Sequence, residues 1–343
     1  MKNRFIYFDK KESALLGTEE ISAEPKSREV FLKADYDVLS AGTELANYRQ
    51  MYNTATGWNG EPKYPHRPGY SVSATVLKCG RDVTRFKEGD KALVTWSGHN
   101  AYFLKQEDAL YKIPEGVDQK AAAFAHLCSF PFLGVRKLNI QLGESVMVAG
   151  LGILGLLAIQ IAKLSGATPV LACDFSEERR KLALELGADY VFDPADPDFV
   201  QKIRAVTDGK GPDGVVEVTG YIPALKQALE YIAEFGRITL LGCTRVSDET
   251  VDFYRYVHLR GIQIIGCHTS TRPAFESRPG MWTEKDDYRT YFKLVKNGRL
   301  DVEKIIHQTV LPEDCASVYQ NLITAKNPPV GILFDWTGSD YQD

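Results

Sequence analysis

The sequence predicts an α/β protein in which a doubly wound parallel sheet is joined to a second, β-rich unit. Two observations lead to this fold class. Residues 1 to about 114 hold short β-branched or aromatic runs separated by Gly, Pro and other turn residues, whereas from about residue 119 apolar runs alternate with helical stretches. The length of 343 residues agrees with this division, because it suits roughly two domains of about 150 residues each.

The first part is expected to be a compact β unit. Strands are predicted at 29–34, 70–77 and 91–96, because these runs are rich in β-branched and aromatic residues. The segment 52–67, which contains Gly and Pro at several positions, is predicted to be a loop. It is long for a connection inside a compact domain, and loops of that kind usually serve a function or are mobile.

The second part is expected to be the parallel sheet. A helix over 121–137 introduces it, and helical stretches such as 176–186 and 223–235 separate the apolar runs. Continuous apolar runs are typical of parallel strands that are buried on both faces. From about residue 269, the pattern predicts helices at 286–297 and 312–325 and a last strand at 330–334. The strands expected in the sheet are 145–149, 169–173, 190–192, 214–218, 237–241 and 261–265.

Composition and charge exclude several classes of function. The formal net charge is -4 without a concentrated Lys/Arg stripe, so neither nucleic acid nor an anionic membrane is an expected partner. No apolar run reaches the roughly 20 residues of a membrane span, and the first 37 residues are too charged for a signal peptide. The six cysteines are scattered without a C-x-x-C pair, which favours a reducing compartment. We therefore expect a cytoplasmic protein.

The strongest chemical signal is a G-x-G-x-x-G motif at 150–155, which follows a predicted strand and opens an apolar helix. In that context the motif is typical of a dinucleotide-binding (Rossmann) unit. The first glycine permits a tight turn, the second lets the backbone approach a pyrophosphate, and the third lets the helix pack closely on the strand. The pyrophosphate then meets free N–H groups at the positive end of the helix. The cofactor-binding residues expected here are Gly150, Gly152, Ile153, Leu154 and Gly155.

The end of the next strand predicts which dinucleotide is bound. Asp174 can accept hydrogen bonds from both ribose hydroxyls and would repel a 2′-phosphate, so NAD(H) is favoured over NADP(H). Arg179 follows one turn into the next helix, where it could lie over the adenosine end. Thr219 and Gly242-Cys243 come after later strands and should face the same crevice. The alternative is a Gly-rich turn of another α/β sheet, with Asp174 as a helix cap.

Together with the segments 86–91 and 113–117 and the helix 121–136, the glycine motif gives the chain a resemblance to a known family. Over nearly its whole length it resembles the medium-chain dehydrogenase/reductase superfamily, alcohol dehydrogenase type. This resemblance implies a GroES-like catalytic domain made of 1–126 and 269–343, interrupted by a Rossmann domain at 127–268. It also implies self-association into a dimer or tetramer, because nucleotide domains of this superfamily usually pair by sheet edges.

Zinc-dependent members carry a catalytic metal on three side chains, and the matching positions here read Ala41, Tyr70 and a third near Ala125. Ala cannot donate to a metal, and a neutral Tyr is a poor zinc ligand compared with imidazole or thiolate. The cluster of four cysteines that holds structural zinc in many relatives is also absent from the sequence. The chain thus resembles a zinc-lacking branch, and no metal is expected. A relocated site built from Glu44, His126 and Cys128 is the alternative.

Without a metal, hydrogen-bond donors and a base must handle the proton on the substrate oxygen, while the nicotinamide carries the hydride. The resemblance implies Thr43 as a relay hydroxyl and Tyr70 as a residue that points at the reacting centre. His126 and His268 are candidates because an imidazole side chain can gain or lose a proton near neutral pH, and Glu44 could orient or deprotonate one of these groups. Each also has a structural interpretation. Thr43 could be a turn residue, Tyr70 a strand residue packed on the core, and His126 a helix histidine whose hydrogen bonds are satisfied. His268 could be a surface loop histidine and Glu44 an ion-pair partner.

Amphipathic aromatic residues and polar tips in the expected loops favour a polyol or carbohydrate derivative over a lipid as substrate. The first hypothesis is an NAD(H)-dependent oxidoreductase that interconverts a secondary alcohol and a ketone without zinc. The second is a zinc-free enone or quinone reductase, and the third is a non-catalytic nucleotide-binding protein. The residues behind the substrate interpretation are Tyr48, Tyr52, Trp58, Asn59, Tyr64, Trp96, His99, Asn100, Arg278 and Trp282.

Overall fold

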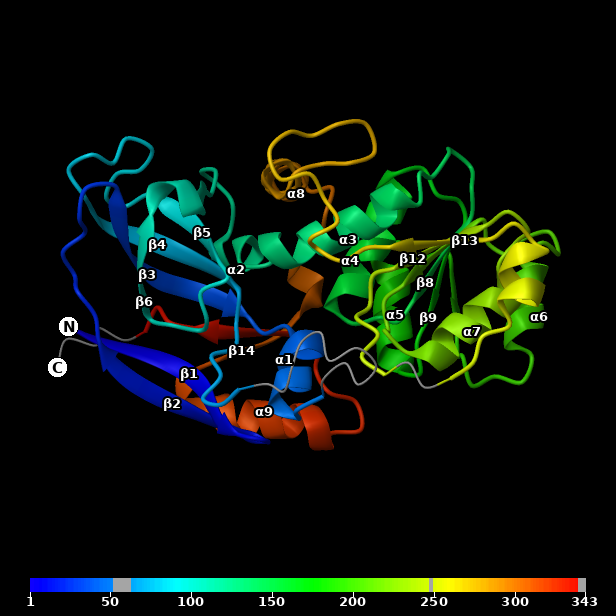
Figure 1. Ribbon diagram of the computed structural model, residues 1–343, viewed down its shortest axis with the longest axis horizontal. Coiled ribbons are helices and arrows are strands. Elements are labelled where there is room, and N and C mark those ends of the chain that lie inside the picture. Colours follow the sequence, from blue (N-terminus) through cyan, green and yellow to red (C-terminus); the bar gives the residue numbers. More distant parts are fainter. Residues whose placement is uncertain (52–62, 247–248, 339–343) are drawn as a thin grey trace. The chain divides into compact units, whose positions relative to one another are not determined.

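The computed structural model describes residues 1–51, 63–246 and 249–338, which form two compact units (Figure 1). The first unit contains the described residues 1–51, 63–127 and 288–338, and the second contains 128–246 and 249–287. In this part of the chain no helix is long and apolar enough to cross a membrane. The chain is thus an α/β protein whose first unit is formed by segments from both ends of the sequence.

The second unit is built on a six-stranded parallel sheet in the order β10-β9-β8-β11-β12-β13. The six expected strands are all present, with ends that differ by at most two residues, and helices connect most of them. The strands are β8 (Val146–Ala149), β9 (Val170–Cys173), β10 (Tyr190–Phe192), β11 (Gly214–Glu217), β12 (Arg237–Leu240) and β13 (Gln263–Gly266). The helices are α4 (Ile153–Leu164), α5 (Glu177–Glu185), α6 (Phe199–Ala205) and α7 (Ile222–Tyr231), with a short π-helix at Tyr254–His258.

Burial explains why these strands are almost uniformly apolar. Met147, Leu171, Val215 and Ile238 come from four neighbouring strands and are completely buried in one cluster. Burying a side chain of this size stabilises the fold by about 1.5–3 kcal/mol. The strand order reverses between β8 and β11, so the carboxyl ends of these two strands flank the position where a ligand binds in doubly wound sheets.

The first unit contains a seven-stranded sheet in the order β14-β15-β3-β4-β5-β7, with β6 paired to β3, and a separate hairpin. The strands expected at 29–34, 70–77, 91–96 and 330–334 are confirmed as β3, β4, β5 and β15, while the hairpin and the helix α1 were not expected. The strands are β1 (Lys2–Lys10), β2 (Ser13–Glu20), β3 (Glu29–Val38), β4 (Ser71–Cys79), β5 (Lys91–Thr95), β6 (Tyr102–Gln106), β7 (Leu110–Lys112), β14 (Ile306–Val310) and β15 (Gly331–Asp335). Its helices are α1 (Ala41–Tyr48), α2 (Gln119–Ala122) and α9 (Cys315–Thr324), while α3 (Ala125–Lys137) and α8 (Glu284–Lys296) have residues in both units.

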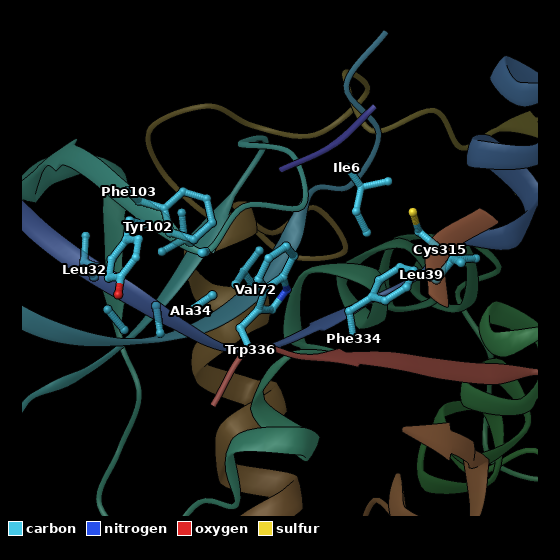
Figure 2. Packing of buried hydrophobic residues seen from close by; sticks show 14 of the residues in the cluster. Ile6, Leu32, Ala34, Leu39, Val72, Tyr102, Phe103, Cys315, Phe334 and Trp336 are labelled. Carbon is cyan, nitrogen blue, oxygen red and sulfur yellow. The ribbon is translucent and has the colours of Figure 1, made fainter. Parts of the chain in front are cut away.

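The core of the first unit joins side chains that are far apart in the sequence (Figure 2). Ile6, Leu32 and Val72 pack in one cluster with Phe334 and Trp336 from the C-terminal strand region, and all five are at most 1% exposed. The return of the C-terminal segment is therefore a requirement of the core, since β15 pairs with β3, and Phe334 in β15 and Trp336 directly after it are two of the largest buried side chains.

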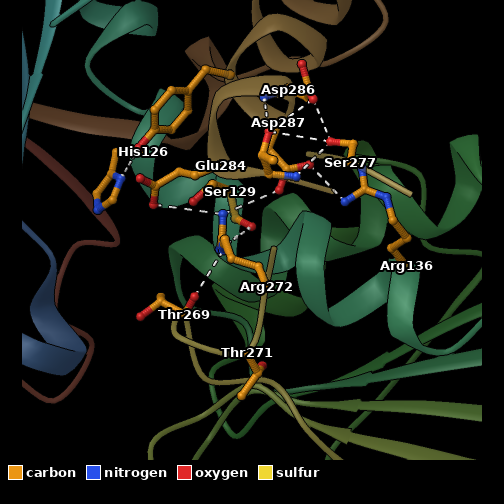
Figure 3. Close-up of polar contacts among 12 residues, drawn as sticks. His126, Ser129, Arg136, Thr269, Thr271, Arg272, Ser277, Glu284, Asp286 and Asp287 are labelled. Carbon is orange, nitrogen blue, oxygen red and sulfur yellow. Dashed lines mark hydrogen bonds and ion pairs between the residues drawn. The ribbon is translucent and has the colours of Figure 1, made fainter. Parts of the chain in front are cut away.

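Two expectations about boundaries differ from the structure. The helix expected over 121–137 is divided into α2 and α3, with residues 123 and 124 between them. Residues 269–287, expected with the catalytic domain, lie in the second unit. Arg272 explains this placement, because its guanidinium is 3.4 Å from the Asp287 carboxylate and donates to the Ser129 carbonyl oxygen at 3.2 Å (Figure 3). These contacts hold the segment to the start of α3.

Candidate functional site

The glycine motif forms an open turn at the start of α4. Gly150 has φ +97°, a left-handed conformation that favours glycine, and Gly152 is the N-cap of the helix. A Cβ at Gly152 would meet no atom within 4 Å, whereas a Cβ at Gly155 would overlap the carbonyl oxygen of Gly150. Thus Gly155 is required for helix–strand packing, while Gly152 leaves space outside the backbone. This combination fits a pyrophosphate at the helix N-terminus, held by Gly152, Ile153 and Leu154.

Asp174 follows β9 and joins this turn to the next loop. Its Oδ2 accepts a hydrogen bond from the Leu151 N–H at 2.8 Å, and its Oδ1 accepts one from the Ser176 N–H at 2.9 Å. The N-cap of α5 is Ser176, whose hydroxyl accepts from the Arg179 N–H, so Asp174 is not the cap of that helix. Each carboxylate oxygen has a further lone pair, and Asp174 can therefore hold a ribose while also fixing the glycine turn.

A buried carboxylate that the sequence analysis missed organises the two later loops. Glu217, at the end of β11, is 1% exposed and accepts hydrogen bonds from the backbone N–H groups of Thr219 at 2.8 Å and Gly220 at 3.1 Å, and from the Thr219 hydroxyl. Burial raises its pKa despite these donors. A Cβ at Gly242 would overlap Gly220, and the exposed Cys243 follows at once. The predicted Thr219, Gly242 and Cys243 therefore lie together, at the ends of β11 and β12.

In the first unit, the structure brings two predicted catalytic residues into contact. The rings of Tyr70 and His126 meet edge to face at 5.6 Å between centroids, and Trp96 stacks on Tyr70 at 5.1 Å. His126 is fully buried, and its Nδ1 lies 2.5 Å from the hydroxyl of Tyr288, which is also buried. We call these four residues the aromatic cluster. Tyr288 was missed because it lies in α8, 162 residues from His126 along the chain.

Glu44 is linked to Tyr70 through Ser40. Glu44, 1% exposed in α1, accepts a hydrogen bond from the Ser40 N–H at 2.8 Å, and the Ser40 hydroxyl accepts one from the Tyr70 hydroxyl. Glu44 also accepts from the Tyr319 hydroxyl and forms an ion pair with His99, with 3.0 Å between Oε2 and Nε2. Burial favours the neutral carboxyl, yet His99 and these donors lower the pKa of Glu44 below its usual value. This is the ion-pair environment given above as the structural interpretation of Glu44.

The remaining candidate catalytic residues lie outside the aromatic cluster. Thr43 is exposed in the first turn of α1. His268 is exposed in the second unit, just after β13, and its Nδ1 lies 2.8 Å from the Ser270 hydroxyl. Both side chains are accessible to solvent.

The residues that led us to expect a polyol or carbohydrate substrate differ in their exposure to solvent. Tyr48, His99 and Asn100 are buried, and the Tyr64 hydroxyl donates to the Asn47 carbonyl oxygen at 2.9 Å. Of the two described tryptophans in this set, Trp96 is 59% exposed beside Tyr70, while Trp282 lies under the Arg136 guanidinium at 4.3 Å. Arg278 is exposed. Most of the predicted loop 52–67, with Tyr52, Trp58 and Asn59, lies outside the described residues.

Among residues 1–51, 63–246 and 249–338, no three His, Cys, Asp or Glu side chains are grouped so that they could hold a metal ion. Of the side chains of the alternative metal site, Glu44, His126 and Cys128, the first and the last have environments that do not suit zinc coordination. Glu44 is occupied by His99 and Tyr319, and burial raises the pKa of the Cys128 thiol well above its usual value, which disfavours the thiolate that zinc requires.

Both units match families of known proteins. Residues 37–135 match the alcohol dehydrogenase GroES-like domain, and residues 154–284 match the zinc-binding dehydrogenase family. The chain belongs to the zinc-type medium-chain alcohol dehydrogenase family, whose members depend on a nicotinamide cofactor.

Two sequence relatives and one solved structure are similar to this chain. D-guloside 3-dehydrogenase from Shigella flexneri is 31% identical over 252 residues, which cover 71% of this chain and 69% of the relative. Sorbitol dehydrogenase from Halalkalibacterium halodurans is 25% identical over 292 residues, or 76% of this chain and 82% of the relative. A Sinorhizobium meliloti 1021 zinc-binding dehydrogenase solved with NADP shares the fold, with a TM-score of 0.81 and 20% identity over 98% of this chain and 99% of that one.

Proposed function

We propose that this protein is an NAD(H)-dependent oxidoreductase that interconverts a secondary alcohol and a ketone on a polyol or carbohydrate derivative, without catalytic zinc. Membership of the family supports the general reaction, in which an oxidoreductase acts on an alcohol. The 31% identity to a guloside dehydrogenase supports a carbohydrate substrate. The observation that carries the zinc-free mechanism is the contact of Tyr70 with His126 in the aromatic cluster.

We assign nucleotide binding to the second unit. Gly150, Gly152 and Asp174 would hold the cofactor, and a bound nicotinamide supplies the acceptor or donor of the hydride. The choice of NAD(H) rests on the Asp174 carboxylate, which favours ribose hydroxyls over a 2′-phosphate. The similar structure solved with NADP makes this choice a necessary test, because that cofactor is bound by a protein of the same fold.

We assign proton handling to the first unit. When an alcohol is oxidised, its hydroxyl proton must leave as the C–H hydrogen departs with two electrons. His126 is the proposed base, because imidazole takes up a proton near neutral pH. Tyr288, at 2.5 Å from Nδ1, orients the imidazole ring. Tyr70 is the proposed donor of a hydrogen bond to the substrate oxygen, which is the role of the metal in zinc-dependent relatives. For that bond the Tyr70 hydroxyl hydrogen turns from Ser40 to the substrate, and the Ser40 hydroxyl then donates to the Tyr70 oxygen.

The zinc-free assignment is supported by the residues at the positions of the metal ligands. Ala41 has no donor atom, and the Tyr70 hydroxyl is directed at Ser40. These environments suit hydrogen bonding better than coordination of zinc.

The test is a screen of NAD reduction against polyols, free sugars and glycosides, run with metal analysis of the same preparation. We expect turnover with a secondary alcohol of one of these classes and less than stoichiometric zinc. One tightly bound zinc per chain would overturn the zinc-free mechanism. Turnover confined to enones or quinones would support the reductase instead, and NADH binding without turnover of any class would support a non-catalytic protein.

A further inference from the structure

The buried side chains next to α1 form a charged network that the proposed mechanism does not use. Asp37 in β3, His99 after β5 and Glu44 in α1 are each at most 1% exposed. The two nitrogens of the His99 ring each face one carboxylate, with Nδ1 at 2.9 Å from Asp37 and Nε2 at 3.0 Å from Glu44. Burying charged groups costs free energy even when they are paired, and burial raises the pKa of Asp37 although His99 opposes this shift.

His99 is held in this position by its surroundings. Gly69 has φ +98°, and a Cβ there would lie 2.6 Å from Nδ1 of His99, so the ring packs directly on the Gly69 backbone. Phe334 covers the ring edge to face at 5.1 Å. On the far side of Asp37, the Trp336 indole N–H donates to the second carboxylate oxygen at 2.9 Å. The imidazole therefore has one tightly defined orientation.

The network leads to Tyr70 through two further steps. Glu44 accepts from the Ser40 N–H while the Ser40 carbonyl oxygen accepts from the Glu44 N–H at 2.9 Å, which fixes Ser40 at the start of α1. The Ser40 hydroxyl then accepts from the Tyr70 hydroxyl. We infer that His99 is a positioning residue that, through Glu44 and Ser40, holds the Tyr70 hydroxyl in place for the reaction. This inference rests on the role proposed for Tyr70.

The charge of the network supports the inference. Burial would keep His99 neutral, but Asp37 and Glu44 outweigh burial and raise the pKa of His99 to about 10. His99 is thus an imidazolium at neutral pH, with N–H groups on both nitrogens, and it holds Glu44 as a carboxylate. Glu44 accepts from the Ser40 N–H, which fixes the Ser40 backbone beside Tyr70, while the Ser40 hydroxyl can accept from the Tyr70 hydroxyl, as it does here, or donate to it.

The test uses a signal from Tyr70 that does not depend on knowing the substrate. Protein labelled with 3-fluorotyrosine is studied by ¹⁹F NMR, and the Tyr70 resonance, one of 17, is identified by its absence in Tyr70→Phe. Asp37→Asn and Glu44→Gln should both shift or broaden this resonance, and Ser40→Ala should do the same. The control is Glu107→Gln, because Glu107 is an equally buried carboxylate bound to Arg28, Thr84 and Arg85 instead. An unchanged Tyr70 resonance in Asp37→Asn and Glu44→Gln would overturn the inference.

Kinetics with the alcohol found in the screen separate positioning from general destabilisation. Glu44→Gln should lower kcat about tenfold with KM little changed, since small misplacement of a reacting group is costly. In a Tyr70→Phe background the same substitution should have almost no further effect, and Ser40→Thr should retain most activity because the hydroxyl remains. An equal loss in both backgrounds would refute positioning through Tyr70. Full turnover of Tyr70→Phe alone would instead refute the role of Tyr70 in the proposed function. His99→Gln is expected to fold poorly, so the neighbouring variants carry the test.

Discussion

The cofactor preference of Asp174 gives the sharpest test of the second unit, through the substitution Asp174→Asn. Both carboxylate oxygens accept a backbone N–H, from Leu151 at 2.8 Å and from Ser176 at 2.9 Å. An amide has one acceptor oxygen, so one of these N–H groups loses its partner. The ribose hydroxyls also lose a charged acceptor, and because a hydrogen bond to a charged group contributes about 1.5–3 kcal/mol, NADH affinity should fall about tenfold or more.

The ratio of affinities is more informative than either affinity. Removing a negative charge near a 2′-phosphate relieves about 1–4 kcal/mol of repulsion at a separation of about 4 Å, depending on the local dielectric. The affinity for NADPH relative to NADH should therefore rise about tenfold or more. Fluorescence titration with the two reduced cofactors measures both values, and the ratio cancels any common loss caused by a disturbed glycine turn.

The matched control is Asp193→Asn. Asp193 follows β10, the neighbouring strand of the same sheet, and its carboxylate is 3.2 Å from Arg180. Its removal should leave the ratio of affinities unchanged. The reasoning about Asp174 would be refuted if the wild-type protein bound NADPH more tightly than NADH, or if Asp174→Asn left the ratio as it was.

Three further predictions follow from the same contacts. Gly155→Ala should destabilise the second unit and abolish cofactor binding, because its Cβ would overlap the Gly150 carbonyl oxygen. Gly152→Ala has open space around the new Cβ, so it should keep the midpoint of thermal unfolding but weaken NADH binding. Equal unfolding midpoints for the two variants would contradict this prediction. The pKa of His99 is raised to about 10 in the folded protein. The contribution of protonated His99 to the free energy of unfolding is therefore complete below about pH 6.5 and decreases as pH rises through 10. Urea unfolding between pH 6 and 10 should show this decline, and a His99→Gln variant that folds should lack it. Tyr288→Phe removes the hydroxyl at His126 Nδ1 and should lower kcat about tenfold and change the pH–rate profile; an unchanged profile would exclude Tyr288 from orienting the base.

Much of the second unit could be predicted because its signals are local. Each parallel strand is buried on both faces, so it reads as a continuous apolar run, and the Gly150–Gly155 spacing reflects contacts within one turn. Glu217 could have been noticed as an acidic residue that ends the apolar strand β11 directly before Thr219 and Gly220. Its role in accepting their N–H groups depends on the folded loop.

The first unit was predicted less completely because its chemistry depends on residues that are distant in the sequence. Tyr288 reaches His126 across 162 positions, and Tyr319 reaches Glu44 across 275. No local pattern around His99 distinguishes a buried imidazolium from a residue that faces the substrate. Its environment is created by Asp37 and Glu44, which approach it from a strand and a helix.

The sequence by itself determined the class of the protein and the nucleotide motif, because these depend on short-range spacing and on residue type. Only the tertiary structure decided which polar groups are accessible and which are tied to one another. Burial turns Glu44 from a candidate acid or base into the partner of a buried imidazolium, and packing brings Tyr70 against His126. Both effects arise from charges and rings that meet only when the chain folds, since electrostatic interactions become strong where water is excluded.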